Sequence, residues 1–227
     1  MCYGVTVASG DAVEGPGQGP KPAVASTQTS LKEAIVRAAI ELGTELGEEG
    51  LTMRGIAARL GVSATALYQH FEGKASILRA IRFHGLSLLN KELAPAFTLD
   101  DPVEQIRDCA LRYIGFARSN PWLYALLFEG EELDFQSLSD DERVLISFSQ
   151  SEVTKVFERG KEAGKLREDI DAKTAPFLMW AANHGLAMLM ITGRISEQHP
   201  TFPVSNEEEF IRAFVESEVR SMVPCPS

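Results

Sequence analysis

Apolar residues recur every three or four positions through most of the 227-residue chain, and no segment shows a convincing alternation of apolar and polar residues. This spacing matches the turn of an α-helix, so the chain is predicted to be all-α. Residues 30–48 and 74–93 each form one apolar stripe, and two shorter helices fit between them, within residues 52–71. The residues expected to face inward in the two longer helices are Leu31, Ile35, Ala38, Leu42, Leu46, Ile77, Ile81 and Leu88.

The helical pattern continues to the end of the chain. Pro102 and Pro121 suit the first turn of a helix, because proline lacks the amide hydrogen that would be unpaired there. Asp140 or Asp141 is expected to cap a long helix that ends near Gly164. Asn206 is expected to cap a last helix, whose apolar residues are Phe210, Ile211, Phe214 and Val215.

The most apolar stretch covers residues 175–191, within a predicted helix at about 172–193. It falls short of the roughly 20 residues that a membrane span needs, and it contains Pro176, Asn183 and His184. We therefore predict a buried helix and no membrane partner.

The two short helices are joined in a way that favours DNA binding. Thr52 and Ser63 are predicted N-caps, and Gly61 supplies the left-handed backbone that ends the first helix. Leu67 and Phe71 lie four residues apart on the buried face of the second helix. Helix, glycine turn and helix form the helix-turn-helix plan, in which the second helix enters the DNA major groove.

The second short helix offers short and polar side chains for reading bases. Ala64, Thr65, Ala66 and Gln69 occupy its predicted exposed face. Gln69 is suited to bidentate pairing with adenine, and the methyl groups of the other three to contact with thymine. Arg54, at the start of the first helix, can reach a guanine or a phosphate.

An ordered set of residues in this region resembles the TetR family of bacterial transcriptional regulators. The set, within residues 30–95, comprises Ile56-Ala57, Gly61-Val62-Ser63, Leu67-Tyr68, His70-Phe71 and Lys74. The resemblance implies phosphate contacts at Thr52, Ser63, Tyr68, His70 and Lys74. A capping or packing role for His70 and a half-buried structural role for Tyr68 are the alternatives.

A second resemblance covers the C-terminal half and concerns the TetR C-terminal class known as the WHG domain. It is carried by Trp180, His184-Gly185, Tyr113, Phe116-Ala117, Asn120-Pro121, Tyr124 and Phe128. It implies a helical ligand-sensing and dimerisation domain. The predicted organisation is a disordered extension at 1–28, a DNA-binding domain with its connecting helix at 29–96, and the sensor at 97–227.

Aromatic residues of the predicted sensor are candidates for a ligand pocket, although such residues more often form core. With one histidine, the candidates are Tyr113, Phe116, Trp122, Phe128, Phe177, Trp180 and His184. For His184 a packed or hydrogen-bonded core position is favoured over a ligand contact. The sequence shows no metal-ligand spacing, phosphate loop or catalytic set, so we expect no metal, no cofactor and no enzyme activity.

The net charge of −10 is unevenly distributed. Residues 30–96 contain eight basic and seven acidic side chains, so the acidic excess lies in residues 97–227. This excess would limit nonspecific DNA binding, or it could simply aid solubility. Cys2, Cys109 and Cys225 are too dispersed for a disulfide or zinc framework, which favours the cytoplasm.

Together these features favour a homodimeric, TetR-like repressor that binds double-stranded operator DNA and is released by a small-molecule effector. The helix at 172–193 and the last helix are expected to form a four-helix interface between subunits. Two rival hypotheses are a helical small-molecule enzyme with a vestigial DNA-binding head and a ligand-independent architectural DNA-binding protein.

Overall fold

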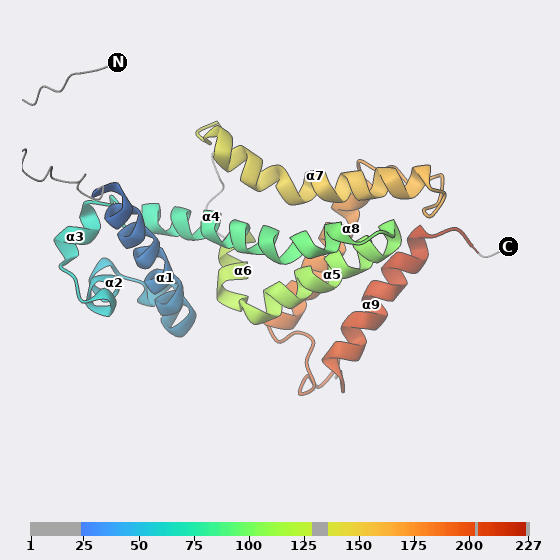
Figure 1. Cartoon of the computed structure of the whole chain (residues 1–227). Coiled ribbons are helices and arrows are strands. Elements are labelled where there is room, and N and C mark those ends of the chain that lie inside the picture. Colours follow the sequence, from blue (N-terminus) through green and yellow to red (C-terminus); the bar gives the residue numbers. More distant parts are fainter. Residues whose placement is uncertain (1–23, 129–135, 203, 226–227) are drawn as a thin grey trace, which may run out of the picture.

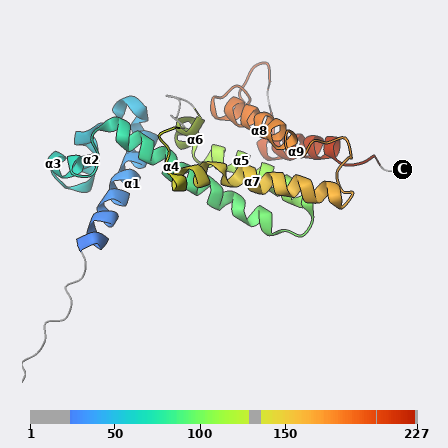
Figure 2. The same cartoon turned by 90° about the horizontal axis from the view of Figure 1, so that it is seen from above.

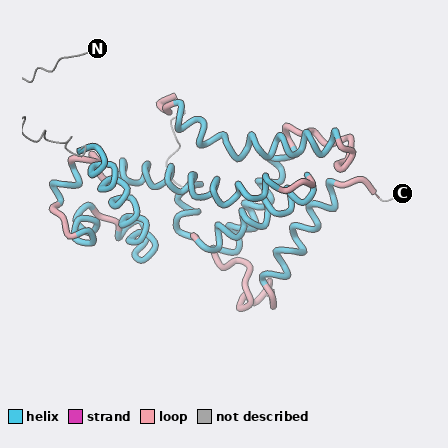
Figure 3. The backbone as a smooth tube through the Cα atoms, in the orientation of Figure 1, coloured by secondary structure: helices cyan, strands magenta, loops and turns pink. Residues whose placement is uncertain are grey.

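The computed structural model describes residues 24–128, 136–202 and 204–225, with side chains from residue 31 onward. Its elements are α1 (Val24–Gly50), α2 (Met53–Leu60), α3 (Ala64–Tyr68), α4 (Lys74–Leu93), the 3₁₀ helix η1 (Ala94–Thr98), α5 (Pro102–Ser119), α6 (Pro121–Phe128), α7 (Asp140–Glu162), α8 (Ala175–Ile191) and α9 (Glu207–Met222). The described residues contain no β-strand (Figure 3), which confirms the predicted all-α class. None of their helices is long and apolar enough to span a membrane.

The predicted extension, residues 1–28, lies outside the described residues except for its last five, which already belong to α1. This helix therefore begins earlier than its predicted start at residue 30. No glycine or proline interrupts residues 24–42, so the helical turn can continue upstream.

Helices α1, α2 and α3 form a small bundle at one end of the molecule, which we call the head (Figure 1). Ile35 and Leu42 of α1 are buried in one core with Ile56 of α2 and Leu67 of α3. Leu46 was expected to continue the inward row, but its side chain is 58% exposed. The reason is the break in α1 at Gly47, which has a φ of 72°, so the helical register of the apolar stripe ends there.

Helix α4 connects this head to the rest of the molecule, which we call the body (Figure 1). Its buried positions, every fourth residue, are Ile77, Ile81, Gly85, Leu89 and Leu93. Leu88 was predicted to face inward, but its side chain is 36% exposed. The buried residues of α4 are spaced four apart, and this spacing places Leu89 on the buried face instead of Leu88. One continuous helix thus has its first turns in the head and its last turns in the body.

The body is built around α5, which contacts α4, α6, α7, α8 and α9. Ile114, Tyr124, Phe157 and Val215 bury their side chains almost completely in its core. Figure 2 shows α7 and α8 running along the body beside α5, with α9 near the C-terminal end of the chain. The N-cap of α7 is Ser139 rather than either predicted aspartate, because its hydroxyl accepts the amide hydrogen of Glu142 at 3.3 Å.

A glycine allows the head and body to pack closely. A Cβ built on Gly43 of α1 would lie 2.2 Å from ring atoms of Trp122 on α6. No larger residue fits at this position without moving the indole, so the contact between α1 and α6 depends on glycine. Trp122 therefore belongs to the junction between the head and the body.

Candidate DNA interface and ligand cavity

The turn between α2 and α3 has the predicted geometry. The Thr52 hydroxyl accepts the amide hydrogen of Gly55 at 3.0 Å, which caps α2. Gly61 ends that helix with a φ of 66°, in the left-handed region. The Ser63 hydroxyl accepts the amide hydrogen of Ala66 at 3.2 Å and starts α3. All three local predictions are confirmed, and they fix the angle between the two short helices.

The predicted base-reading residues differ in their accessibility. Thr65 and Gln69 are exposed, whereas Ala64 and Ala66 are half-buried. Ala64 packs partly against the core of the head, so its methyl group is less available than the sequence pattern predicted. Tyr68, on the same short helix, is 56% exposed, which argues against the alternative of a half-buried structural side chain.

The basic residues of the head fall into two groups. Arg54 is exposed at the first turn of α2, next to the exposed cap residue Thr52. Arg59 instead contacts two carboxylates of α1, Glu45 at 2.6 Å and Glu41 at 3.4 Å. The hydrogen bond from Arg59 lowers the pKa of Glu45. The sequence does not reveal these ion pairs, because Glu41 and Glu45 lie on a different helix from Arg59.

Lys74 and His70 lie beside the end of α3 and are both half-buried. The Lys74 ammonium donates to the carbonyl oxygen of Glu48 at the end of α1. An ammonium has three hydrogens, so this bond holds the side chain in place and leaves two donors for a phosphate. His70 lines a surface cavity between the head and α7, together with Arg79 and Glu142, which are 2.8 Å apart.

The body contains a second feature, a cavity of about 520 Å³ between α4, α5, α6, α7 and α8. Four of the predicted pocket residues, Tyr113, Phe128, Phe177 and Trp180, line it. Sequence reasoning missed most of the other walls, which include Leu86, Leu89, Asn90, Leu93, Cys109, Val153, Gln150 and Asn183. Their apolar spacing resembles that of any core helix. The sequence signal that could have identified these walls is the presence of the amide side chains Asn90, Gln150 and Asn183 within helical segments.

The other three predicted pocket residues do not line this cavity. Phe116 is buried in the core, and Trp122 packs at Gly43 as described above. His184 lies behind the wall, where its Nδ1 is 2.7 Å from the Tyr124 hydroxyl. The favoured prediction for His184, a hydrogen-bonded histidine, agrees with this contact.

Hydrogen bonds join the aromatic wall of the cavity into one network. The Tyr113 hydroxyl accepts from Trp180 Nε1 at 2.9 Å and from the Tyr124 hydroxyl at 2.9 Å. Burial raises the pKa of Tyr113 to about 12, so its hydroxyl is neutral at physiological pH. The network fixes the ring orientations and presents their apolar surfaces to the cavity.

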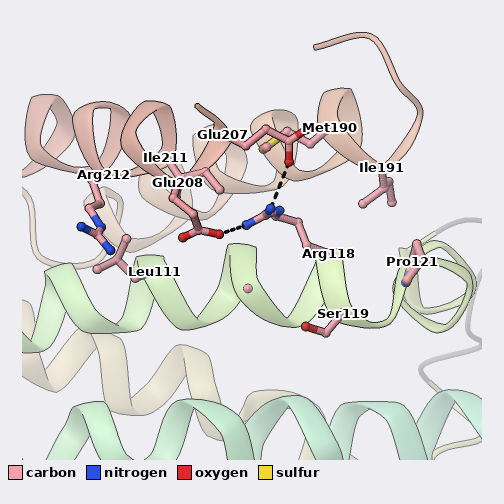
Figure 4. A pocket seen from close by; sticks show the side chains of 11 residues that line it. Leu111, Arg118, Ser119, Pro121, Met190, Ile191, Glu207, Glu208, Ile211 and Arg212 are labelled. Atoms are coloured by element: carbon pink, nitrogen blue, oxygen red, sulfur yellow. Dashed lines mark hydrogen bonds and ion pairs between the residues drawn. The ribbon is translucent and has the colours of Figure 1, made fainter. Parts of the chain in front are cut away.

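A different site lies between α5, α8 and α9 (Figure 4). Its volume is about 760 Å³. Its central cation, Arg118, already contacts Glu208 at 2.5 Å and Glu207 at 3.0 Å. An anionic ligand would have to displace these glutamates to reach Arg118, although Arg212 also lines the site. The cavity beside Tyr113 is therefore the better candidate for a small-molecule site.

Two protein-family models, one for an N-terminal and one for a C-terminal domain, match successive parts of this chain. Residues 35–81 match the bacterial regulatory proteins of the tetR family. Residues 106–215 match the tetracyclin repressor-like C-terminal domain. The matches follow the head and the body in order and together cover well over half of the chain. This chain belongs to the TetR family. It is a DNA-binding transcriptional regulator with a helix-turn-helix, and members of this family are not enzymes. The narrower WHG class stays a prediction.

Similar proteins include a tetracycline repressor of class C from Escherichia coli, 50% identical over 50 residues. That match covers 22% of this chain and 23% of the repressor, so the chain spans less than a quarter of its length. A nucleoid occlusion factor, SlmA, from Haemophilus influenzae is 32% identical over 114 residues, covering 47% of this chain and 52% of that protein.

Solved structures share the fold of this chain over most of its length. The TetR regulator PfmR from Thermus thermophilus has a TM-score of 0.59 at 25% identity, covering 82% of this chain and 97% of its own. A Rhodococcus protein of unknown function has a TM-score of 0.71 at 21% identity, covering 86% and 96%. These similarities place the head, α4 and the helical body within one known architecture.

Proposed function

We propose that this TetR regulator is a homodimeric repressor that leaves its operator when a small molecule enters the cavity of about 520 Å³. The observation that carries the proposal is the course of α4. This helix begins with Lys74 beside α3 and ends with Leu89, Asn90 and Leu93 on the cavity wall. A ligand that shifts the cavity end of α4 would move the head at its other end.

Exposed and half-buried residues on and beside α3 supply the DNA contacts in this proposal. Gln69 and Thr65 read base edges, with Ala64 and Ala66 beside them. Phosphates are bound by the residues that flank the recognition helix, namely Thr52, Arg54, Ser63, Tyr68, His70 and Lys74. The hydroxyls of Thr52 and Ser63 accept backbone hydrogens, so each still has its own hydrogen to donate to a phosphate. Support comes from the exposure of Thr52, Arg54, Ser63, Thr65, Tyr68 and Gln69 on and beside α3.

An uncharged stripe on α8 supports the homodimer. Leu178 and Leu189 are 67% and 44% exposed, and Ala181, Ala182 and Gly185 between them are exposed too. No Asp, Glu, Lys or Arg occurs between positions 174 and 193. A contiguous apolar surface of this kind typically marks a protein interface, and small residues allow close approach of a partner helix.

A charge placed in this stripe tests the dimer. Leu189→Glu should yield a folded monomer in sedimentation, because the side chain already contacts solvent within one subunit. Operator affinity should fall with dimerisation, since one head covers only a half-site. Leu99→Glu is the matched control, because Leu99 is 40% exposed and lies outside the stripe. A wild-type protein that is monomeric at micromolar concentration with full operator affinity would refute the dimer.

The rival with support in the comparisons is a ligand-independent DNA-binding role, given the similarity to nucleoid occlusion factors. The cavity favours ligand control, because well-packed cores have few voids larger than a water molecule. The test is a titration of the operator complex, followed by fluorescence anisotropy, with a library of small molecules. Release by a compound whose binding is lost on cavity substitution supports the repressor. Operator affinity that no cavity-binding compound changes supports the rival.

A further inference from the structure

Helix α7 is a second connection between the cavity beside Tyr113 and the head, in addition to α4. Ile146, Ser147 and Val153 of α7 line that cavity. The first turn of α7 lies one turn before Ile146, packs beside α4 (Figure 2) and borders the surface cavity that contains His70. One helix therefore has contacts both with the cavity and with the edge of the head.

Two sets of hydrogen bonds hold α7 against α4. At the cavity, the Asn90 amide donates to the carbonyl oxygen of Leu145 at 2.9 Å and accepts from the Ser149 hydroxyl. At the head end of α4, Arg79 Nη2 donates to Glu142 Oε1 at 2.8 Å. Arg79 and Asn90 are eleven residues apart, which is about 16 Å along a helix. Two separated attachments fix the position of α7 along α4 better than one would.

Both members of this ion pair are held in place by further contacts. The guanidinium carbon of Arg79 lies 5.1 Å from the centre of the Phe83 ring, one turn along α4. Glu142 Oε2 accepts the amide hydrogen of Ser139 at 2.9 Å, in the capping box of α7. That bond, together with the one from Arg79, holds the pKa of Glu142 below its usual value. One carboxylate therefore both caps α7 and attaches it to the head end of α4.

We propose that Glu142 is a positioning residue for DNA binding, which holds the head at a fixed angle to the body through Arg79. This inference rests on the proposed homodimer, because two heads on one operator must meet major grooves at a fixed spacing. An acid near DNA ordinarily weakens binding through repulsion of the phosphates. A favourable effect of Glu142 would therefore be opposite in sign to that of its charge.

Glu142→Gln and Asp141→Asn are matched variants, because each removes one negative charge from the first turn of α7. Asp141 is exposed and has no ion pair in the described part of the chain. The amide introduced at position 142 has one acceptor oxygen, so it can bind the Ser139 amide hydrogen or Arg79 but not both. Only the variant at position 142 should therefore loosen the contact with α4.

Fluorescence anisotropy of the full-length protein measures binding to an operator obtained by selection and to a random-sequence duplex of equal length. Glu142→Gln should weaken operator binding about two- to fivefold, the effect of one partly exposed ion pair. Its affinity for the random duplex should not fall, and its salt slope on the operator should not change, because no phosphate contact is lost. Asp141→Asn should bind the operator at least as tightly as the wild type.

Arg79→Gln tests whether Glu142 acts through Arg79. In the Arg79→Gln background, Glu142→Gln should cause no further loss of operator affinity, because its partner is already absent. A general structural role of Glu142 would instead weaken binding to both duplexes and in both backgrounds. Either of these losses, or wild-type operator affinity of Glu142→Gln, would overturn the inference.

Sedimentation of the same samples separates this inference from the proposed function. Weakened operator binding by a dimeric Glu142→Gln protein would support the positioning role. Dissociation of that variant into monomers would assign the loss to the subunit interface and overturn the inference, while the homodimer would stand. A wild type that is monomeric with full operator affinity would refute the homodimer itself, and with it the need for a fixed angle of the head.

Discussion

Removal of the hydroxyl oxygen should affect different properties of the protein at two of its tyrosines. Tyr124 is fully buried in the body, and its hydroxyl contacts Tyr113 at 2.9 Å and His184 at 2.7 Å. Tyr68 is 56% exposed on α3, next to the predicted base-reading residues. Tyr124→Phe should therefore reduce stability, whereas Tyr68→Phe should reduce operator affinity.

The magnitude follows from the two buried bonds of Tyr124. Each such bond contributes about 0.5–1.5 kcal/mol net, so the phenylalanine variant should lose about 1–3 kcal/mol of unfolding free energy. For a chain of this size, 1 kcal/mol lowers the melting temperature by roughly 2–4 °C. Tyr68→Phe should change stability by less than about 0.5 kcal/mol, as exposed substitutions usually do. Its operator affinity should fall about three- to tenfold if the hydroxyl binds a phosphate.

Chemical denaturation gives the stability of each variant, and anisotropy with labelled operator gives its affinity. The affinity of Tyr124→Phe is measured at a temperature well below its melting transition, so that the folded fraction is constant. Equal stability of the two variants would refute the assignment of the Tyr113–Tyr124–His184 network as a stabilising contact. Unchanged affinity of Tyr68→Phe would refute the proposed phosphate contact of that hydroxyl.

Three further predictions address the DNA contacts and a buried acid. Lys74→Ala should weaken binding to all DNA sequences and flatten the dependence of affinity on salt by about one unit, whereas an unchanged slope would exclude a phosphate contact. Gln69→Ala should relax preference at one operator position, at a cost of about 1–3 kcal/mol measured on single-base operator variants; uniform loss on all variants would indicate a backbone contact. Burial raises the pKa of Glu218 from 4.5 to about 7, against a hydrogen bond from Asn183 that lowers it. Between these pH values the folded state holds a proton that the unfolded state has released, so the contribution of Glu218 to stability should be full below pH 4.5 and fall as the pH rises to about 7. Glu218→Gln should lessen this fall in melting temperature, and an identical pH profile of the two proteins would contradict the shift.

The head was largely predictable from sequence because its signals are local. Caps at Thr52 and Ser63 and the left-handed turn at Gly61 depend on residues within one helical turn. The break at Gly47 was not predicted, since a glycine near a helix end does not reveal which conformation it will adopt. Arg59 also lay beyond local reasoning, because its partners are on another helix.

The cavity was predictable only in part, because it is assembled from five helices. Aromatic content identified Tyr113 and Trp180 on α5 and α8. The walls from α4 and α7 follow the same apolar period as packed core, so periodicity alone does not separate a cavity lining from a filled interior. Trp122 illustrates the converse error, since its ring fills the space above Gly43 and does not border the cavity.

Selection of bound sequences from random double-stranded DNA tests the account most directly. A dimeric regulator with one helix-turn-helix in each subunit should enrich two inverted half-sites, with centres about 34–36 Å apart along the duplex or a multiple of that spacing. The enriched sequences should lose affinity in the Leu189→Glu protein, whose stripe on α8 is charged. Enrichment of a single half-site with full affinity, or no enrichment above nonspecific binding, would contradict the proposal of a dimeric operator-binding repressor.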